Sequence, residues 1–334
     1  MKLGILDQVP RQEGASEQET IAHTIALARK AEKWGYHRYW FAEHHSSNGL
    51  LSAAPELWLS RVGAETSTIK IGSGGVLLPQ YSPLKVAETF STLASFYPDR
   101  VELGVGRSPG GSERTREALT DGGEKRFEEF PRQLDDLAGF LNDQLPRTHP
   151  YRIIKTTPRH AHAPPLWLLG LSPESGRHAG ERGIGLVFGH FINPDKWEET
   201  LETYRQTFIP SAERNEPAVI VCVFAVCAET REEAEKLALT QDLWLQGIAR
   251  GNTVIPSIEK AEKETLAPGQ KEKIAQKRRR AVVGTPADIR KALEDLQEKY
   301  QTAEFLLINN TYGFAARKRS FELIAEEFHL QEQY

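Results

Sequence analysis

An acidic residue and two histidines follow one another directly after an apolar run near the start of the chain. The stretch is YWFAEHHSSNG, residues 39–49, and it places Glu43, His44 and His45 where a strand is expected to end. An imidazole titrates near neutral pH, so either histidine could act as a general acid or base. The same side chains could instead bind a metal ion, or could serve only to hydrogen-bond neighbouring strand ends.

Two observations argue against a metal site. Neighbouring residues of a strand point to opposite faces, so His44 and His45 cannot both turn towards one ion without a bend in the chain. The sequence also has no HExxH spacing and no further cluster of histidine, cysteine and carboxylate residues typical of zinc. We therefore expect no metal. His44 becomes a candidate catalytic residue, with a purely structural role as the alternative.

A second group of residues could bind an anion. Arg107 ends an apolar run in GVGRSPGG, and LSPESGRHAG places Ser172 at the N-cap of a helix with Pro173 at its first position. The free N–H groups and the dipole of such a helix start favour phosphate, and Ser175 adds a hydroxyl donor. The carboxylate of Glu174 must then point away from the phosphate. In the alternative interpretation, Ser172 is an ordinary cap and Arg107 a surface cation.

A regular alternation of short apolar runs and amphipathic stretches must position these residues. KLGILD (residues 2–7) is expected to be a strand, and the helix after it opens with Ser16 and Glu19 in capping-box spacing. Seven further apolar runs are each followed by a helical pattern, at residues 38–45, 70–78, 100–107, 164–172, 184–191, 218–229 and 302–310. Eight such units across 1–334 predict a single α/β domain, a (β/α)8 TIM barrel, rather than an open doubly wound sheet.

Three segments depart from the alternation. A hairpin is expected near residues 147–160, and Pro131 is expected to break or kink the helical pattern at 125–141. The polar stretch 248–283 follows the seventh strand-helix unit, and long insertions at the strand ends of barrels often form lids. Its KRRR run, residues 277–280, could meet an anion or a partner, or could be a solvated helix face.

In a TIM barrel the carboxyl ends of the strands carry the active site. The expected strand ends are rich in glycine and short polar residues, namely Asp7, Gln8, Glu43, His44, His45, Gly74, Gly75, Gly106, Arg107, Leu171, Ser172, Gly189, His190, Asn309 and Asn310. This composition favours a wide, flat ligand such as an isoalloxazine ring, whose edge would meet backbone. The alternative is that the glycines only turn the chain. A dinucleotide fingerprint is not met, because the third glycine of that motif is missing from GVGRSPGG.

Composition excludes several other classes of protein. The 334 residues carry a net charge of −4, without the strongly basic balance of a nucleic-acid-binding protein. No window approaches 18 uncharged apolar residues, and the N-terminus lacks the apolar core of a signal peptide. Cys222 and Cys227 would lie roughly 16 Å apart on one strand, too far for a disulfide. We therefore expect a reduced, cytoplasmic protein that binds neither nucleic acid nor a membrane.

The chain resembles the bacterial luciferase-like flavin-dependent monooxygenases over almost its whole length. The similarity lies in seven motifs in order, which are LGILDQ, YWFAEHH, IKIGSGGVLLPQYSPLKVAETFSTL, FYPDRVELGVGRSPGG, ERGIGLVFGHF, VGTPADIRKALEDL and NTYGFAARKRSFELIAEEF. The resemblance implies a barrel that binds FMN, or reduced FMN from a separate flavin reductase, and oxidises a small organic substrate with O2. It also implies a homodimer and a mobile lid at residues 248–283.

The resemblance also assigns roles to single residues. His44 matches the histidine beside the reactive edge of the flavin, and Gly74 and Gly75 match a small-residue pair under the ring, joined in some members by a cis peptide. Arg107, Glu174 and Ser175 match residues at the phosphate, and Arg126 matches another basic residue near the cofactor. We expect Ser172, at the same helix start, and Glu43, beside His44, to complete the cofactor site. His178 and Gly189 depart from the light-emitting relatives, which have hydroxyl residues there, so bioluminescence is not expected.

Three hypotheses on function remain. The first is an FMN-dependent monooxygenase with His44 as acid or base. The second is a dehydrogenase on the same barrel that uses the deazaflavin F420 and transfers hydride instead of activating oxygen. The third is a non-catalytic flavin-binding or scaffold protein. Titration with each reduced cofactor, with and without oxygen, separates them.

Overall fold

The parallel strands of this protein close into a barrel. The computed structural model describes residues 1–108, 110–123, 127–159, 162–248 and 250–331 of the chain. Its strands are β1 (Lys2–Asp7), β2 (Arg38–Phe41), β3 (Lys70–Leu77), β4 (Val101–Gly106), β5 (Leu166–Gly170), β6 (Gly185–Gly189), β7 (Val219–Cys227), β8 (Ala281–Gly284) and β9 (Glu304–Ile308). Pairing of β6 with β7, and of β7 with β9, closes the ring of β1 to β7 and β9. The predicted (β/α)8 barrel is confirmed.

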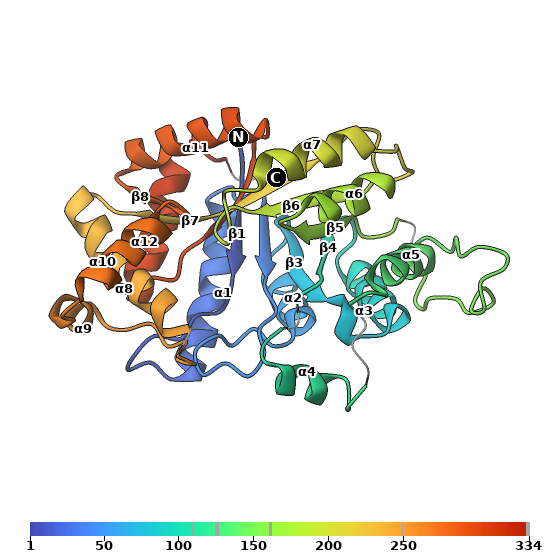
Figure 1. The fold of residues 1–334 in the computed structure, drawn as a ribbon, viewed down its shortest axis with the longest axis horizontal. Coiled ribbons are helices and arrows are strands. Elements are labelled where there is room, and N and C mark those ends of the chain that lie inside the picture. The colour runs from blue at the N-terminus through green and yellow to red at the C-terminus, as the bar shows by residue number, and fades with distance from the viewer. Residues whose placement is uncertain (109, 124–126, 160–161, 249, 332–334) are drawn as a thin grey trace.

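Helices surround the barrel on the outside (Figure 1). They are α1 (Glu17–Lys33), α2 (Pro55–Gly63), the 3-10 turn η1 (Leu78–Gln80), α3 (Pro83–Phe96), α4 (Glu113–Leu119), α5 (Phe130–Leu141), α6 (Pro173–Glu181), α7 (Trp197–Thr207), α8 (Arg231–Ile248), α9 (Ile258–Lys263), α10 (Pro268–Arg278), α11 (Pro286–Tyr300) and α12 (Phe314–Glu327). The capping box expected at Ser16 is present, because the Ser16 hydroxyl accepts from the Glu19 N–H and the Glu19 carboxylate accepts from the Ser16 N–H.

Large aromatic side chains fill the barrel interior, and glycines make room for them. Trp40 of β2 and Trp167 of β5 meet edge to face, with ring centroids 6.1 Å apart. A Cβ on Gly72 would lie 2.4 Å from Nε1 of Trp40, and one on Gly185 would lie 2.2 Å from Cε3 of Trp167. These strand glycines are therefore required by packing inside the barrel, not by a turn.

A buried ion-pair cluster lies at the amino ends of three strands. Arg38 Nε lies 3.0 Å from Glu102 Oε2, and Arg38 Nη1 lies 2.8 Å from Glu304 Oε2. The indole N–H of Trp40 donates a 2.8 Å hydrogen bond to Glu102. Burial alone would lower the pKa of Arg38, but the carboxylates of Glu102 and Glu304 raise it above its usual value. Such pairing is what makes a charged group tolerable in an interior.

The structure differs from the expected elements at three places. Strand β2 ends at Phe41, so Glu43, His44 and His45 lie in the segment that follows it. The hairpin expected near residues 147–160 is wrong, because the described residues there form turns and bends without a strand. Helix α5 begins at Phe130 with Pro131 in its first turn, where a proline costs no hydrogen bond, so Pro131 starts this helix and does not kink it.

The insertion 248–283 is more ordered than its polar sequence suggests. It contains α9 and α10 and ends in β8, a ninth strand that pairs with residues 224–227 of β7, beyond those that pair with β6. The basic run at 277–280 is used in the fold, since Arg278 Nε lies 2.6 Å from Asp242 and Arg279 Nη2 lies 3.0 Å from Asp195. The run 277–280 is therefore not a purely solvated helix face.

Two findings bear on the compartment expected from the sequence. Cys222 and Cys227 are both buried on β7 as free thiols, in agreement with the predicted absence of a disulfide between them. None of the described helices combines the length and the apolar character that a membrane span requires. The cytoplasmic location stays a prediction.

The close contact of Gly185 with Trp167 can be tested by mutation. In Gly185→Ala the new methyl group would overlap Trp167, so we expect the free energy of unfolding to fall by about 1–3 kcal/mol. Chemical and thermal unfolding curves measure the change. Gly269→Ala is the matched control, because a Cβ at this position in α10 meets no atom within 4 Å. It should be neutral or slightly stabilising, and equal behaviour of the two variants would contradict the packing argument.

Candidate functional site

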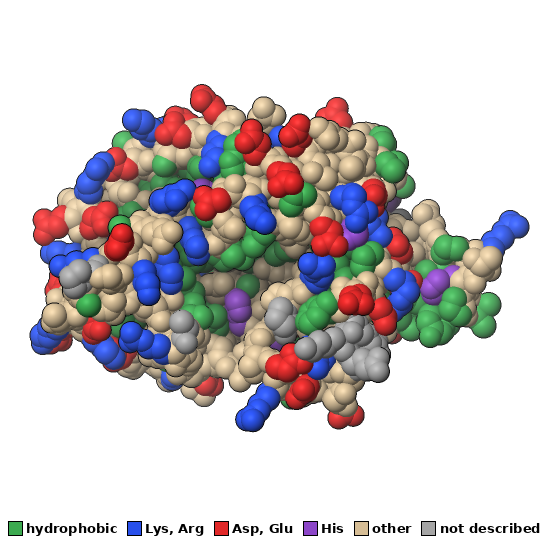
Figure 2. Space-filling model, viewed as in Figure 1, with side chains coloured by type: hydrophobic (Ala, Val, Ile, Leu, Met, Phe, Trp, Pro, Cys, Tyr) green, Lys and Arg blue, Asp and Glu red, His purple; other side chains and the backbone are tan. Residues whose placement is uncertain are grey.

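The carboxyl ends of the barrel strands meet at one end of the molecule, because every strand pairing is parallel. In Figure 1 the arrow of β1 points from the N-terminus at the top towards the lower part of the view, where α4 lies. Figure 2, drawn from the same side as Figure 1, shows a recess near the centre of the view. It is lined by hydrophobic side chains and has a histidine side chain inside it. The predicted site residues lie in, or directly after, the four neighbouring strands β2 to β5, at this end of the barrel.

His44 lies in the segment after β2 and contacts Gln8 at the end of β1. Its Nε2 atom is 3.0 Å from Nε2 of Gln8, whose own Oε1 accepts a hydrogen bond from the amide of Asn310. Burial and the neighbouring His45 lower the pKa of His44 to about 4. The imidazole is therefore neutral at physiological pH.

The carboxylate of Glu43 is held by three protein groups. The Tyr81 hydroxyl donates to it at 2.6 Å, the Leu77 backbone N–H donates at 3.0 Å, and His45 Nε2 lies 2.7 Å away. Burial and this carboxylate raise the pKa of Tyr81 well above its usual value. Glu43 thus ties the segment that carries His44 to the end of β3. Its predicted contact with a cofactor stays a prediction.

Gly74 and Gly75 are joined by a cis peptide bond within β3. A Cβ on Gly74 would lie 2.5 Å from Cδ1 of Leu6, and one on Gly75 would lie 2.7 Å from the carbonyl oxygen of Gly104. Neither position admits a side chain unless its neighbours shift. Packing within the protein therefore requires both glycines, and their predicted place under a flat ligand stays a prediction.

The helix start expected at Ser172 is present in α6, and its binding of an anion stays a prediction. Ser172 is the N-cap, and its hydroxyl accepts from the Ser175 N–H at 3.3 Å and lies 3.1 Å from the Ser175 hydroxyl. A Cβ on Gly170 would lie 2.2 Å from Cβ of Ser175, so this glycine lets Ser175 pack against the end of β5. Two hydroxyl groups and the first N–H groups of a nine-residue helix are thereby held together.

Arg107 reaches the same turn from the end of β4. Its Nη1 atom lies 3.3 Å from Oε2 of Glu174, and both side chains are about half exposed. A hollow of about 620 Å³ opens here, lined by Arg107, Phe127, Glu128, Pro131 and Glu174. Exposed ion pairs contribute little to stability, so Arg107 can exchange this carboxylate for another anion at low cost. The residues present therefore fit a phosphate group. The predicted Arg126 lies outside the described residues.

Some strand-end residues do not come to this site. His190, after β6, lies with Nδ1 2.6 Å from the Tyr300 hydroxyl and Nε2 3.1 Å from the Arg279 carbonyl oxygen, and burial lowers its pKa to about 4. Asp7 is buried in an ion pair with Arg317 of α12, at 2.9 Å. These two side chains connect the barrel to its helices and are not available to a ligand in the recess.

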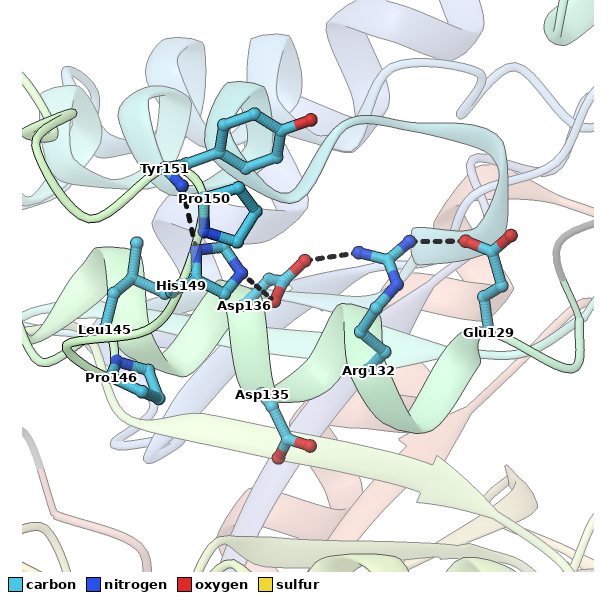
Figure 3. A pocket seen from close by; sticks show the side chains of 9 residues that line it. All are labelled: Glu129, Arg132, Asp135, Asp136, Leu145, Pro146, His149, Pro150 and Tyr151. Atoms are coloured by element: carbon cyan, nitrogen blue, oxygen red, sulfur yellow. Dashed lines mark hydrogen bonds and ion pairs between the residues drawn. The ribbon is translucent and has the colours of Figure 1, made fainter.

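A second hollow, of about 840 Å³, lies between α5 and the segment 145–151 (Figure 3). Arg132 pairs there with Glu129 and Asp136, and His149 Nε2 lies 3.1 Å from Asp136 Oδ1. These charged groups are thus already paired with one another, and none of the predicted site residues lines the hollow. This hollow is therefore not the candidate active site.

Two residues of the site were missed in the sequence. Tyr81 follows η1 and belongs to the segment PQYSP directly after the third strand, so its place past a strand end was an available signal. Gln241 lies in the middle of α8 and accepts a 3.0 Å hydrogen bond from the Asn310 N–H. Nothing in its local sequence marks it. Among the described residues, no group of three or more histidine, cysteine or acidic side chains could hold a metal ion.

Comparison with known proteins identifies relatives that extend over nearly the whole chain. The sequence model of the luciferase-like monooxygenases matches residues 1–302. The Bacillus subtilis protein YceB is 50% identical over 327 residues, which cover 98% of this chain and 99% of YceB. The N-acetyl-S-alkylcysteine monooxygenase of Bacillus subtilis is 34% identical, and the alignment covers 98% of each chain.

Solved structures share the barrel. Apo-MsnO8 is 35% identical with a TM-score of 0.90, and the superposition covers 99% of each chain. The oxygenating constituent of 3,6-diketocamphane monooxygenase in complex with FMN (TM-score 0.73, 20% identity, 98% and 97% coverage) shares the fold. So does an F420-dependent secondary alcohol dehydrogenase (TM-score 0.68, 15% identity, 98% coverage of each chain). With a family model and near-full-length relatives in agreement, the chain belongs to the luciferase-like monooxygenase family.

Proposed function

We propose that this protein is an FMN-dependent monooxygenase that uses reduced FMN and O2 to oxidise a small organic substrate. The observation that carries the proposal is that a turn suited to an anion and a neutral histidine lie at the carboxyl end of the same barrel. Arg107 and the start of α6 provide the turn, and His44 lies across β3 from them. Supply of reduced FMN by a separate flavin reductase, a homodimer and a cytoplasmic location remain predictions.

The chain offers a place for each part of the cofactor. Arg107, Ser172, Ser175 and the first N–H groups of α6 would hold the phosphate, with Gly74 and Gly75 under the ring and His44 beside its reactive edge. Reduced flavin supplies the electrons that activate oxygen, and the protein provides orientation and a dry pocket. His44, neutral and partly exposed, would hydrogen-bond the reacting groups.

The insertion 248–283 is held against the segment that follows the two histidines, which supports its proposed role as a lid. The backbone N–H of Thr253 donates to Asn48 Oδ1 at 2.8 Å, and the Gly49 N–H donates to the Thr253 hydroxyl at 2.8 Å. A Cβ on Gly49 would lie 1.9 Å from the Thr253 carbonyl oxygen. A closed lid would protect the reaction from water.

The choice of cofactor is tested by anaerobic titration with reduced FMN and with reduced F420, followed by oxygen and a panel of substrates. The panel includes S-alkylated N-acetylcysteines, because a relative is named for that reaction. We expect binding of reduced FMN and oxygen-dependent product. Binding of F420 alone would overturn the proposal in favour of a dehydrogenase, and tight FMN binding without product from any substrate would favour a non-catalytic flavoprotein.

Removal of the Arg107 charge should weaken FMN binding. A hydrogen bond to a charged group contributes about 1.5–3 kcal/mol, so the Kd of FMN for Arg107→Leu should rise roughly 10- to 100-fold. Glu174→Gln should lower the Kd roughly two- to fivefold, because the competing carboxylate is removed and exposed charge pairs are worth up to about 1 kcal/mol. Fluorescence titration measures both.

The matched control is Glu181→Gln at the other end of α6, where Glu181 pairs with Arg177. It should leave the Kd unchanged, because the helix separates it from the phosphate turn. If Glu174→Gln weakened FMN binding as much as Arg107→Leu, the assignment of this turn to the phosphate would be wrong.

Removal of the His44 imidazole should reduce turnover without weakening the binding of FMN. In His44→Ala we expect the Kd of FMN to stay within about threefold, while turnover falls roughly 100-fold or more, as on loss of a preorganised hydrogen-bond donor to the reacting groups. Steady-state assays with a flavin reductase measure this. The control is His23→Ala, since His23 is exposed on α1 and stacks on Phe314. Unchanged turnover in His44→Ala would rule out the proposed role.

The pH profile offers an independent check. The pKa of His44 lies near 4, so this group is already deprotonated above about pH 5 and should add no step to the rate between pH 6 and 8. A loss of rate that belongs to His44 should appear only as the pH falls towards 4. A step near pH 6.5 that is present in the wild type and absent from His44→Gln would contradict this assignment.

A further inference from the structure

Two linked amide side chains, those of Asn310 and Gln8, end on His44, and a third buried amide, Gln241, holds the backbone of Asn310. Gln241, Asn310 and Gln8 are 1%, 0% and 5% exposed. The backbone N–H of Asn310 donates to Gln241 Oε1 at 3.0 Å, which holds the chain at Asn310. The Asn310 side chain donates from Nδ2 to Gln8 Oε1, and Gln8 Nε2 lies 3.0 Å from His44 Nε2. The links pass from α8 to the end of β9, then to the end of β1, and finally to the segment after β2. A buried amide chain of this kind fixes the geometry of the group at its end.

The direction of these hydrogen bonds follows from Asn310. Its Oδ1 atom is buried and has no hydrogen-bond partner among the described residues. If the Asn310 and Gln8 amides were both reversed, the NH2 group of Asn310 would occupy that position, and Gln8 Oε1 would face His44. A buried N–H without an acceptor is rarer in proteins than a carbonyl oxygen without a donor. The arrangement in which Gln8 Nε2 donates to His44 is therefore favoured.

We propose that Asn310 and Gln8 are positioning residues that hold His44 in the tautomer with its proton on Nδ1. A ring nitrogen that accepts a hydrogen bond carries no proton, so a donor at Nε2 places the single proton of the neutral ring on Nδ1. The neutral ring is the form present at physiological pH, since burial and His45 lower the pKa of His44.

The consequence is that His44 offers a ligand an N–H group and not a lone pair. Its Nδ1 atom makes no hydrogen bond to any residue in the described parts of the chain, and the side chain is partly exposed. At neutral pH the residue is thus a hydrogen-bond donor through Nδ1, while its acceptor nitrogen is used by Gln8. This inference rests on the proposed function only in assigning that donor to the reacting groups.

The tautomer can be measured directly on the full-length protein without flavin. Protein labelled with 15N-histidine is examined at pH 7 by long-range 1H–15N correlation NMR, and the His44 signals are identified by their loss in His44→Gln. We expect Nε2 to show the large downfield 15N shift of an unprotonated ring nitrogen, and Nδ1 the shift of a protonated one. Free histidine favours the opposite tautomer, so His44 with the proton on Nε2 would overturn the proposal.

Asn310→Asp reverses the chain at constant size. A carboxylate cannot donate to Gln8 Oε1, so Gln8 should rotate, give its NH2 group to the new acid and present Oε1 to His44. The His44 proton should then move to Nε2, and its pKa should rise. Asn142→Asp, at the exposed end of α5, is the control and should leave the His44 signals unchanged. An unchanged His44 tautomer in a folded Asn310→Asp protein would refute the proposal that Asn310 acts on His44 through Gln8.

Gln8→Leu provides a second route if Asn310→Asp does not fold. It removes the donor to Nε2, so the His44 signals should shift to the mixture seen for a free imidazole, with the Nε2–H form in excess. Retention of the Nδ1–H form in this variant would also refute the proposal. The NMR readout involves no turnover, so the tautomer and the catalytic role of His44 can fail separately.

Discussion

The barrel depends on a charged cluster that closes its amino end. Arg38 is 3% exposed and Glu102 is 2% exposed, and each lies against an opposite charge in this cluster. Removing one member of such a cluster leaves an unpaired buried charge, at a cost of about 3–5 kcal/mol. Trp40 is hydrogen-bonded to the same cluster and packs against Trp167. With the interior filled from this end, space for a ligand is left at the carboxyl ends of the strands.

At the carboxyl end, most polar side chains are already used within the protein. Glu43 is held by Tyr81, Leu77 and His45, and Asp7 is paired with Arg317, which also donates to the Asn309 carbonyl oxygen at 2.7 Å. These contacts make the strand ends a rigid frame. The groups that this frame leaves to a ligand are Nδ1 of His44, the exposed Arg107 and the start of α6. A preorganised site of this kind loses little freedom when it binds.

Features with a local signal could be predicted from the sequence. The capping box at Ser16, the N-cap at Ser172 and the alternation that implies a barrel all depend on residues a few positions apart. The strand glycines were harder to interpret, because Gly72 and Gly185 are required by Trp40 and Trp167 on neighbouring strands. Strand β8 and the true role of Pro131 also depend on tertiary contacts. In the site, the position of His44 was predictable, but its connection through Gln8 to Asn310 joins residues 302 positions apart.

The close approach of Gly49 to Thr253 links two parts of the protein that would otherwise move separately. The backbone of the insertion rests on the chain four residues after His45, with no space for even a methyl group between them. Opening the insertion must therefore break the hydrogen bonds of Thr253 with Asn48 and Gly49. A shift of the insertion at Thr253 would thus displace the chain a few residues after His45, both through these hydrogen bonds and through direct backbone contact.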